Sequence, residues 1–238
     1  MKQTFYLFVA LFTVSFAIAQ EETDRDDFRW HYSIGAVVNP DFNINEKMLQ
    51  AGVHRIPDVM PSIGLGWSAT AKRMAVDFDF LVAGLNSKKN KGFNLLQAPI
   101  VLKVHYVAVD REKFSFSGGL TASYIFSDLA IFSDNTEIDM NDLNPDTNTG
   151  YIRLNNQSFL LGPSISFKFL KHKKNPLKLT MGYDFSLTNS KWKSDYASVT
   201  NVVKENGGRG FVQLSVPLGT VGEMFRDRPA PAASSVTE

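Results

Sequence analysis

Apolar and polar side chains alternate along eight separate segments of this chain. In one of them, Ile63, Leu65 and Trp67 alternate with Gly64 and Gly66. A period of two is typical of a β-strand, because successive side chains point to opposite faces of the strand. Most segments approach the ~9–11 residues that a tilted strand needs to cross a bilayer. The eight predicted strands cover residues 28–38, 61–69, 74–82, 100–108, 114–126, 159–169, 177–185 and 211–218.

The connections between these segments alternate in length. The short connections are residues 70–73, 110–113 and 171–176. The long connections are residues 39–60, 84–93, 127–158 and 188–208. Outer-membrane barrels have short periplasmic turns and long outer loops, and an even number of strands returns both chain ends to the periplasm. The pattern therefore predicts an all-β fold, an eight-stranded antiparallel up-and-down transmembrane β-barrel.

Alternation alone leaves open which face points inward, since a soluble lipocalin-like barrel also alternates but keeps its apolar side chains inside. The polar face of the predicted strands consists mostly of Ser, Gly, Thr and Ala, with a few Asp, Lys and His and no Glu. A water-exposed exterior normally carries many Lys and Glu. A narrow eight-stranded lumen instead accepts small residues and a few paired charges. We therefore expect the polar face to line the lumen and the apolar face to contact lipid.

Aromatic residues of the apolar face gather near the strand ends, as they do at the interfaces of a membrane. The belt predicted at the periplasmic rim comprises Trp30, Tyr32, Tyr106, Phe114, Phe116, Phe167 and Phe169. The belt predicted at the outer rim comprises Phe80, Tyr124, Phe126, Phe159, Tyr183 and Phe185. Two such belts favour the membrane-spanning interpretation over a soluble barrel.

The first residues predict a secretory signal peptide. Lys2 precedes an apolar run that ends in Ala17-Ile18-Ala19, with small residues at the −3 and −1 positions of a cleavage site. The run is shorter than the ~20 apolar residues of a membrane-spanning helix. The predicted organisation is a signal peptide at 1–19, an outer-membrane β-barrel at 20–218 and a flexible periplasmic tail at 219–238. The tail is either a tether or an unstructured end, and we favour the second because chain termini are usually loose.

The composition argues against several kinds of site. The chain has no cysteine, which excludes disulfides, thiolate metal sites and lipid attachment through an N-terminal Cys. It has 25 Lys and Arg against 24 Asp and Glu, so loss of Lys2 with the signal peptide leaves 24 of each. That balance indicates no nucleic-acid partner. His31 and His105 lack a metal-ligand spacing, and we expect no metal and no cofactor.

The long loops contain fragments of calcium-binding and catalytic patterns. Asp142 to Asp146 begins like a calcium loop, but Thr147 replaces the required Gly and Arg153 stands where the bidentate Glu belongs. No G-x-S-x-G motif occurs. His54 lies near Asp58 in the sequence without an evident third partner. We therefore predict that the protein is not an enzyme and that the acidic loop is solvated.

Several charged residues fall on the face that we expect to line the lumen. Unpaired charges in a narrow interior are costly, so these residues are expected to pair with one another. A structural network that plugs the lumen is favoured over a narrow ion path, because side chains alone fill an eight-stranded barrel. The predicted polar network comprises Arg29, His31, Asp77, Asp79, Lys103, His105, Lys168 and Asp184.

Three segments carry more specific patterns than alternation. NLLQAPIVLKVHY (94–106) combines an aliphatic residue, a Pro and a Lys, at Leu96, Pro99 and Lys103. KFSFSGGLTASYIFS (113–127) is Gly-rich, and GYDFSLTNS (182–190) ends in a Leu-Thr-Asn turn. These segments resemble two successive strands and the seventh strand of the PorT-type outer-membrane β-barrel family of Bacteroidota. The resemblance implies a barrel of this type. Relatives include components of the secretion machinery of that phylum, so a place in such an assembly is an expectation.

These patterns predict a non-enzymatic outer-membrane barrel with a structural or interaction role. Its expected partners are outer-membrane lipid and outer-membrane or periplasmic proteins. A small porin-like pore is one alternative, and a soluble periplasmic lipid-binding β-barrel is another. Fold alone does not decide the role.

Overall fold

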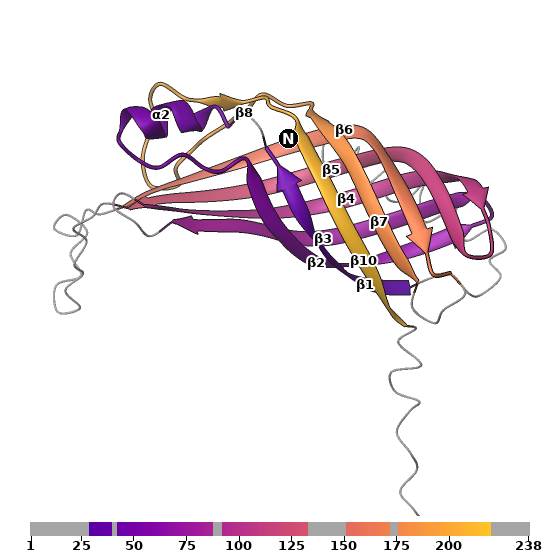
Figure 1. Cartoon of the computed structure of the whole chain (residues 1–238). Coiled ribbons are helices and arrows are strands. Elements are labelled where there is room, and N and C mark those ends of the chain that lie inside the picture. The colour runs from indigo at the N-terminus through magenta and orange to yellow at the C-terminus, as the bar shows by residue number, and fades with distance from the viewer. Residues whose placement is uncertain (1–28, 40–41, 88–91, 133–150, 172–175, 220–238) are drawn as a thin grey trace, which may run out of the picture.

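Eight antiparallel strands close into one barrel in the computed structural model, which describes residues 29–39, 42–87, 92–132, 151–171 and 176–219 (Figure 1). Each strand pairs with the next along the chain, and the first strand pairs with the last. The strands are β1 (Arg29–Val38), β2 (Val59–Ala71), β3 (Met74–Ser87), β4 (Phe93–Asp110), β5 (Phe114–Phe132), β6 (Tyr151–Phe169), β7 (Leu177–Ser186) and β10 (Arg209–Gly219). The predicted up-and-down barrel of eight antiparallel strands is confirmed.

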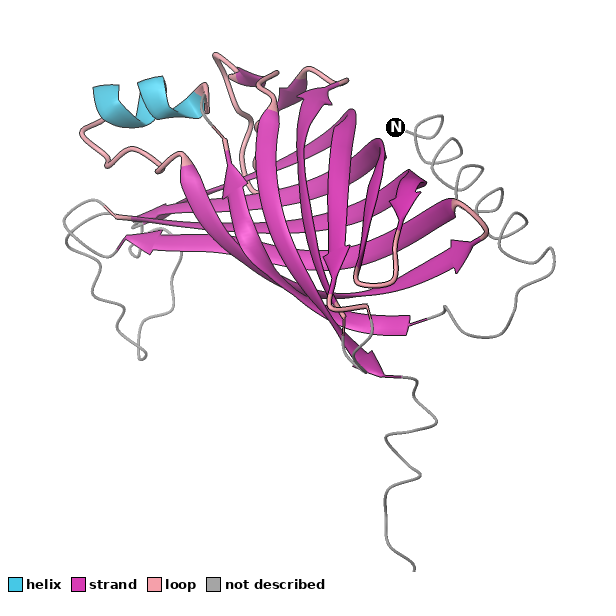
Figure 2. Cartoon of the chain, turned by 45° about the vertical axis from the view of Figure 1, so that its right-hand side comes forward, coloured by secondary structure: helices cyan, strands magenta, loops and turns pink. Residues whose placement is uncertain are grey.

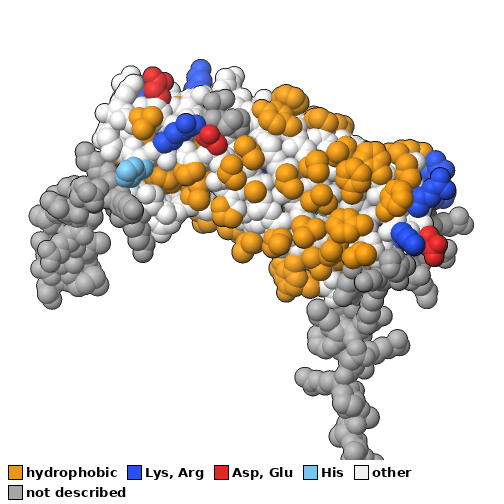
Figure 3. Space-filling view, in the orientation of Figure 1, with side chains coloured by type: hydrophobic (Ala, Val, Ile, Leu, Met, Phe, Trp, Pro, Cys, Tyr) orange, Lys and Arg blue, Asp and Glu red, His pale blue; other side chains and the backbone are white. Residues whose placement is uncertain are grey.

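The apolar face of the strands points outward. Ile34 is 56% exposed, Ile63 is 63% exposed and Leu120 is 56% exposed on the barrel wall. Figure 3 shows hydrophobic side chains spread over the wall between the two ends of the molecule. Such a surface is unfavourable in water and is suited to the hydrocarbon of a bilayer. The arrangement is the reverse of a soluble lipid-binding barrel, and that alternative is wrong.

The aromatic residues predicted at the rims are mostly exposed on this wall, as expected for membrane interfaces. Tyr32, Tyr106 and Phe114 are exposed toward the short turns, and Phe80 and Phe185 are exposed on the strands that lead to the long loops. Phe159 is the exception, because it is only 4% exposed. The segment directly after β7 lies beside its backbone: the Leu187 N–H donates to the Phe159 carbonyl and the Phe159 N–H donates to Thr188 Oγ1.

β4, β5 and β6 are longer than the sequence pattern predicted, with 18, 19 and 19 residues. Much of the predicted loops 84–93 and 127–158 is therefore strand. The apolar face changes side near the long-loop end: Leu95 and Leu129 point inward and are fully buried, while Asp128 lies on the outer face. The pattern that places apolar side chains on the outer face ends at that point, although the strand itself continues. The change of side is expected where a barrel leaves the bilayer and enters water.

The long-loop end is closed by a structure that we call the lid, formed by residues 42–58 and 187–208. It contains the helix α2 (Ile44–Gln50) and a small hairpin of β8 (Ser190–Lys191) and β9 (Lys204–Glu205). Figures 1 and 2 show α2 lying at the end of the barrel away from the short turns. Within the described residues, no helix is long and apolar enough to cross a membrane.

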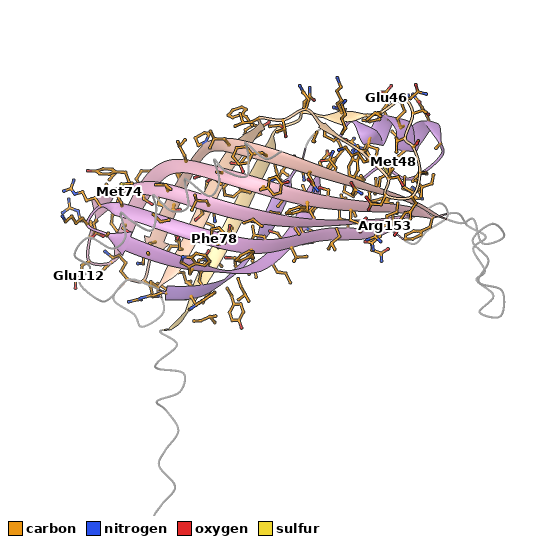
Figure 4. All side chains as sticks on the ribbon, turned by 180° about the vertical axis from the view of Figure 1, so that it is seen from behind. Glu46, Met48, Met74, Phe78, Glu112 and Arg153 are labelled. Carbon is orange, nitrogen blue, oxygen red and sulfur yellow. The ribbon has the colours of Figure 1, made fainter. Side chains whose placement is uncertain are left out.

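An apolar core joins the lid to the barrel. Ile44 and Met48 of α2 pack with Ile56 and with inward side chains of the long strands. In Figure 4, Met48 points from α2 toward the barrel while Glu46 points away. The buried members of this core are Ile44, Met48, Val53, Ile56, Met60, Phe93, Leu95, Leu129 and Trp192. The predicted loops 39–60 and 188–208 are thus partly ordered elements with a core of their own.

Several predictions fall outside the described residues. The signal peptide at 1–19, the tail beyond Gly219 and the acidic loop from Asp134 to Asp146 are among them. These stay predictions.

Candidate functional site

A hydrogen-bonded cluster around Asp79 fills the middle of the lumen, and we call it the Asp79 network. His31 Nε2 lies 2.6 Å from Asp79 Oδ1, and Lys103 Nζ donates to Asp79 Oδ2 at 2.5 Å. Lys103 Nζ also donates to Gln213 Oε1 at 2.7 Å, and Gln213 Nε2 donates to Ser33 Oγ at 2.7 Å. Asp79 is 0% exposed and Lys103 is 2% exposed. The network therefore joins four strands by buried polar contacts.

The position of Gly66 makes this network sterically feasible. Gly66 of β2 is the cross-strand partner of both His31 on β1 and Asp79 on β3, so it lies between the two side chains. A Cβ at Gly66 would overlap Asp79 Oδ1 and lie 2.8 Å from His31 Nε2. Both contacts are far shorter than van der Waals distance. Only glycine at this position lets the imidazole reach across β2 to the carboxylate.

A second group of contacts lies nearer the short turns. Lys178 of β7 forms an ion pair with Asp77, across the lumen from β3. His105 Nε2 lies 2.7 Å from Ser164 Oγ, and Thr121 Oγ1 donates to the same oxygen at 2.6 Å. Ser166 and Thr180 share a hydrogen bond of 2.8 Å between their hydroxyls. His105 is thus placed among hydroxyl groups.

A third group lies toward the lid. Ser123 Oγ donates to Asp184 Oδ2 at 2.9 Å, and Arg209 is the cross-strand partner of Asp184. Arg209 is 2% exposed. Together the three groups place buried polar side chains at successive levels of the interior. Side chains are expected to fill most of the interior of an eight-stranded barrel, and these three groups occupy it at three levels.

The residues of the predicted polar network are distributed among these three groups and the short-turn end of the barrel. His31, Asp79 and Lys103 meet in the Asp79 network. Asp77, His105 and Asp184 belong to the neighbouring groups, each with a partner that the prediction did not include. Arg29 and Lys168 lie at the short-turn end, where they line a cavity of about 100 Å³.

Sequence reasoning missed Lys178, Arg209 and Gln213. Lys178 and Gln213 lie on the polar face of their predicted strands. The period of two could therefore have added both residues to the predicted polar network. Arg209 falls outside the predicted strand because the apolar alternation of β10 begins after it. No group of three or more His, Cys, Asp or Glu residues that could hold a metal ion occurs within the part of the chain that the structure describes.

Glu205 holds the lid in place at the long-loop end. Its Oε1 accepts from the Ile44 N–H at 3.0 Å and from Trp192 Nε1 at 2.8 Å, and its Oε2 accepts from the Asn43 N–H at 2.9 Å. Asn43 makes no side-chain cap to α2. Instead Asn43 Nδ2 donates to the Lys204 carbonyl at 2.6 Å. One carboxylate thus joins the two halves of the lid.

Replacement of Glu205 by alanine is expected to loosen the lid. Three donors lose their acceptor, at a cost on the order of 2 kcal/mol to lid closure. In a background with Trp30→Phe and Trp67→Phe, the remaining Trp192 should show red-shifted emission and several-fold greater acrylamide quenching. Glu46→Ala on the exposed face of α2 is the matched control and should change neither. Unaltered emission and quenching in Glu205→Ala would contradict this role.

The fold and the lumen define a class: the protein is an outer-membrane-type β-barrel with an apolar wall and a polar interior. No protein-family model and no curated protein sequence matches the chain. A major outer membrane protein from Thermus thermophilus is similar in structure, with a TM-score of 0.49 and 8% identity over 80% of this chain and 98% of that one.

Two further solved structures are similar in the same way. OprG from Pseudomonas aeruginosa has a TM-score of 0.45 and 14% identity over 81% of this chain and 98% of its own. Neisserial surface protein A (NspA) has a TM-score of 0.45 and 10% identity over 80% of this chain and 94% of its own. All are outer-membrane or surface proteins by name.

Proposed function

We propose that this protein is a non-enzymatic outer-membrane barrel that acts as a structural or interaction module rather than as a channel. The observation that carries the proposal is the closure of its interior at two levels. The Asp79 network fills the middle of the lumen, and the apolar core of the lid fills the long-loop end. With the interior closed at two levels, the surfaces left for interactions are the lipid-facing wall and the two ends of the barrel. Protein partners would bind at these ends.

Kinship with the PorT-type family is part of this proposal. The three segments that resemble the family correspond to β4, β5 and β7 with the turn that follows it. Lys103, one of the residues that carries the resemblance, is the cation of the Asp79 network. Membership in an outer-membrane or secretion assembly would suit a barrel whose interior is filled and whose long-loop end carries a folded lid.

The purified barrel is expected to be electrically silent in planar lipid bilayers. Both barriers must open before ions pass, so the wild type should show no stable open state. Glu205→Ala should also be silent, because it loosens the lid and leaves the Asp79 network in place. Stepwise, long-lived conductance in the wild type would contradict the proposal and support the porin-like alternative.

A further inference from the structure

A second cavity lies where the lid meets the long-loop end of the barrel (Figure 1), and we call it the amide pocket. Its volume is about 40 Å³, enough for about three groups the size of a water molecule. Gln97 of β4, Ser127 of β5 and Asn156 of β6 are successive cross-strand partners and line the pocket from one level of the barrel. Trp192 of the lid also lines it.

Neighbouring strands end at different heights here, which leaves room for the pocket. β7 ends at Ser186, whereas β6 continues past it toward the long loops. There Asn155 of β6 pairs with Lys193 of the lid. On the side away from β5, the inward face of β6 at Asn156 is therefore bordered by the lid and not by another strand. Residues 207–208 of the lining are only partly buried, so the pocket reaches the surface beside them.

Three buried amide atoms in the lining have no hydrogen-bond partner among the described residues. They are Asn39 Nδ2, Gln97 Oε1 and Asn156 Nδ2. Gln97 is 3% exposed and Asn156 is 5% exposed. A buried polar atom without a partner is costly, and such atoms are uncommon in folded proteins. Two donors and one acceptor are therefore available to a ligand that brings the complementary groups.

The pocket is suited to an uncharged ligand. Glu205 is the only charged side chain among the described residues of its lining. Both carboxylate oxygens of Glu205 already accept hydrogen bonds, from the Ile44 and Asn43 N–H groups and from Trp192 Nε1. The other polar side chains of the lining are amides and hydroxyls. A charged group would find no free partner of opposite sign among them.

A pair of neighbouring hydroxyl groups matches the three amide atoms, because each hydroxyl both donates and accepts. Two hydroxyls can accept from Asn39 Nδ2 and Asn156 Nδ2 while one of them donates to Gln97 Oε1. The apolar part of the lining, which includes Leu160 and Trp192, would contact carbon atoms of the same molecule. A sugar ring presents both features, since it carries hydroxyls along its edge and C–H groups across its face. Apolar walls with a few placed polar groups are typical of small-molecule sites.

We propose that the amide pocket binds the edge of a sugar ring through neighbouring hydroxyl groups. The long loops of outer-membrane barrels face the outside of the cell, so the ligand is an uncharged sugar that reaches the pocket from there. A cavity of about 40 Å³ admits the edge of one ring and not a whole oligosaccharide. This binding role goes beyond the structural or interaction role proposed above, and its test does not depend on whether the barrel conducts.

Saturation-transfer difference NMR with methyl glycosides tests this proposal on the refolded full chain. The probes are methyl α-D-glucopyranoside, methyl α-D-mannopyranoside and methyl β-D-galactopyranoside. The detergent is an uncharged polyoxyethylene ether, because maltoside headgroups carry the same hydroxyls as the probes. We expect saturable binding of at least one glycoside, with a Kd of about 0.1–10 mM. Cyclohexanol, a ring of similar size with a single hydroxyl, should bind about tenfold more weakly. Absence of saturable binding by all the glycosides, or equal binding of cyclohexanol, would overturn the proposal.

Single variants locate the site. Asn156→Ala should weaken glycoside binding about tenfold, and the midpoint of urea unfolding should be nearly unchanged, because Asn156 Nδ2 has no partner among the described residues. An amide with a structural role alone would give the reverse, a lower midpoint and unaltered binding. Gln157→Ala is the matched control, since it removes the next amide of β6 from the exposed outer face.

A second variant covers the case in which Asn156→Ala does not fold. Asn39 lies just after β1 and is only partly buried, so Asn39→Ala should fold and should weaken binding about threefold. Equal weakening by Gln157→Ala would overturn the assignment. Unaltered binding in Asn156→Ala, or in Asn39→Ala, would overturn it as well.

Discussion

Replacement of Asp79 by alanine is expected to destabilise the barrel by about 3–5 kcal/mol, the cost of leaving a buried charge without its partner. Lys103 is 2% exposed and would retain only Gln213 Oε1 as an acceptor. His31 would lose its carboxylate partner as well. Urea unfolding of the reconstituted protein measures the free energy, and the heat-modifiable gel shift reports whether the barrel still forms.

Two further variants separate this effect from simple loss of packing. Asp79→Ala with Lys103→Met removes both charges and should recover much of the stability, because a buried pair is costly mainly when one partner is left alone. Asp128→Ala breaks the exposed pair with Arg153 and should cost less than about 1 kcal/mol. An Asp79→Ala barrel within about 1 kcal/mol of wild type would contradict the central place of this carboxylate.

Replacement of Gly66 by alanine is expected to cost about 3 kcal/mol, at the upper end of the usual range for overpacking. The added Cβ would overlap Asp79 Oδ1 and meet the Phe78 carbonyl oxygen at 2.5 Å. Either the strands must separate or His31 and Asp79 must part. Both changes remove buried hydrogen bonds, and urea unfolding again measures the loss.

Gly118→Ala is the matched control for this substitution, because both glycines lie within strands. The nearest atom to a Cβ at Gly118 is Ile165 Cγ2 at 3.8 Å, an ordinary contact. The control should therefore fold with nearly unchanged stability. If Gly66→Ala and Gly118→Ala unfold at the same urea concentration, the close approach of His31 and Asp79 across β2 is not what requires glycine.

Side chains of different kinds fill the interior at its two levels. The Asp79 network is polar and lies where the wall outside it is apolar. The core of the lid is apolar and lies where charged residues such as Asp128 and Arg153 occupy the outer face. Along each long strand the apolar side chains therefore change from the outer face to the inner face. The outer wall is apolar where it contacts lipid and polar where it contacts water.

The amino-acid sequence by itself determined the number of strands, their antiparallel order and the face that each turns to the lumen. Those properties follow from local regularities, since the pleat alternates side chains and short turns join neighbours. It also placed His31, Asp79 and Lys103 on the inward face. It did not reveal the outer thirds of β5 and β6, because the apolar face changes side where those strands leave the membrane.

Only the tertiary structure decided which inward residues meet. Lys178 reaches Asp77 from 101 residues away, and Lys103 reaches Gln213 from 110 residues away. Glu205 bonds to Ile44 across 161 residues. These partners depend on how the sheet curves and on the register in which the first strand closes on the last, which are properties of the whole barrel. Local sequence patterns therefore could not predict the contacts in the lumen or the structure of the lid.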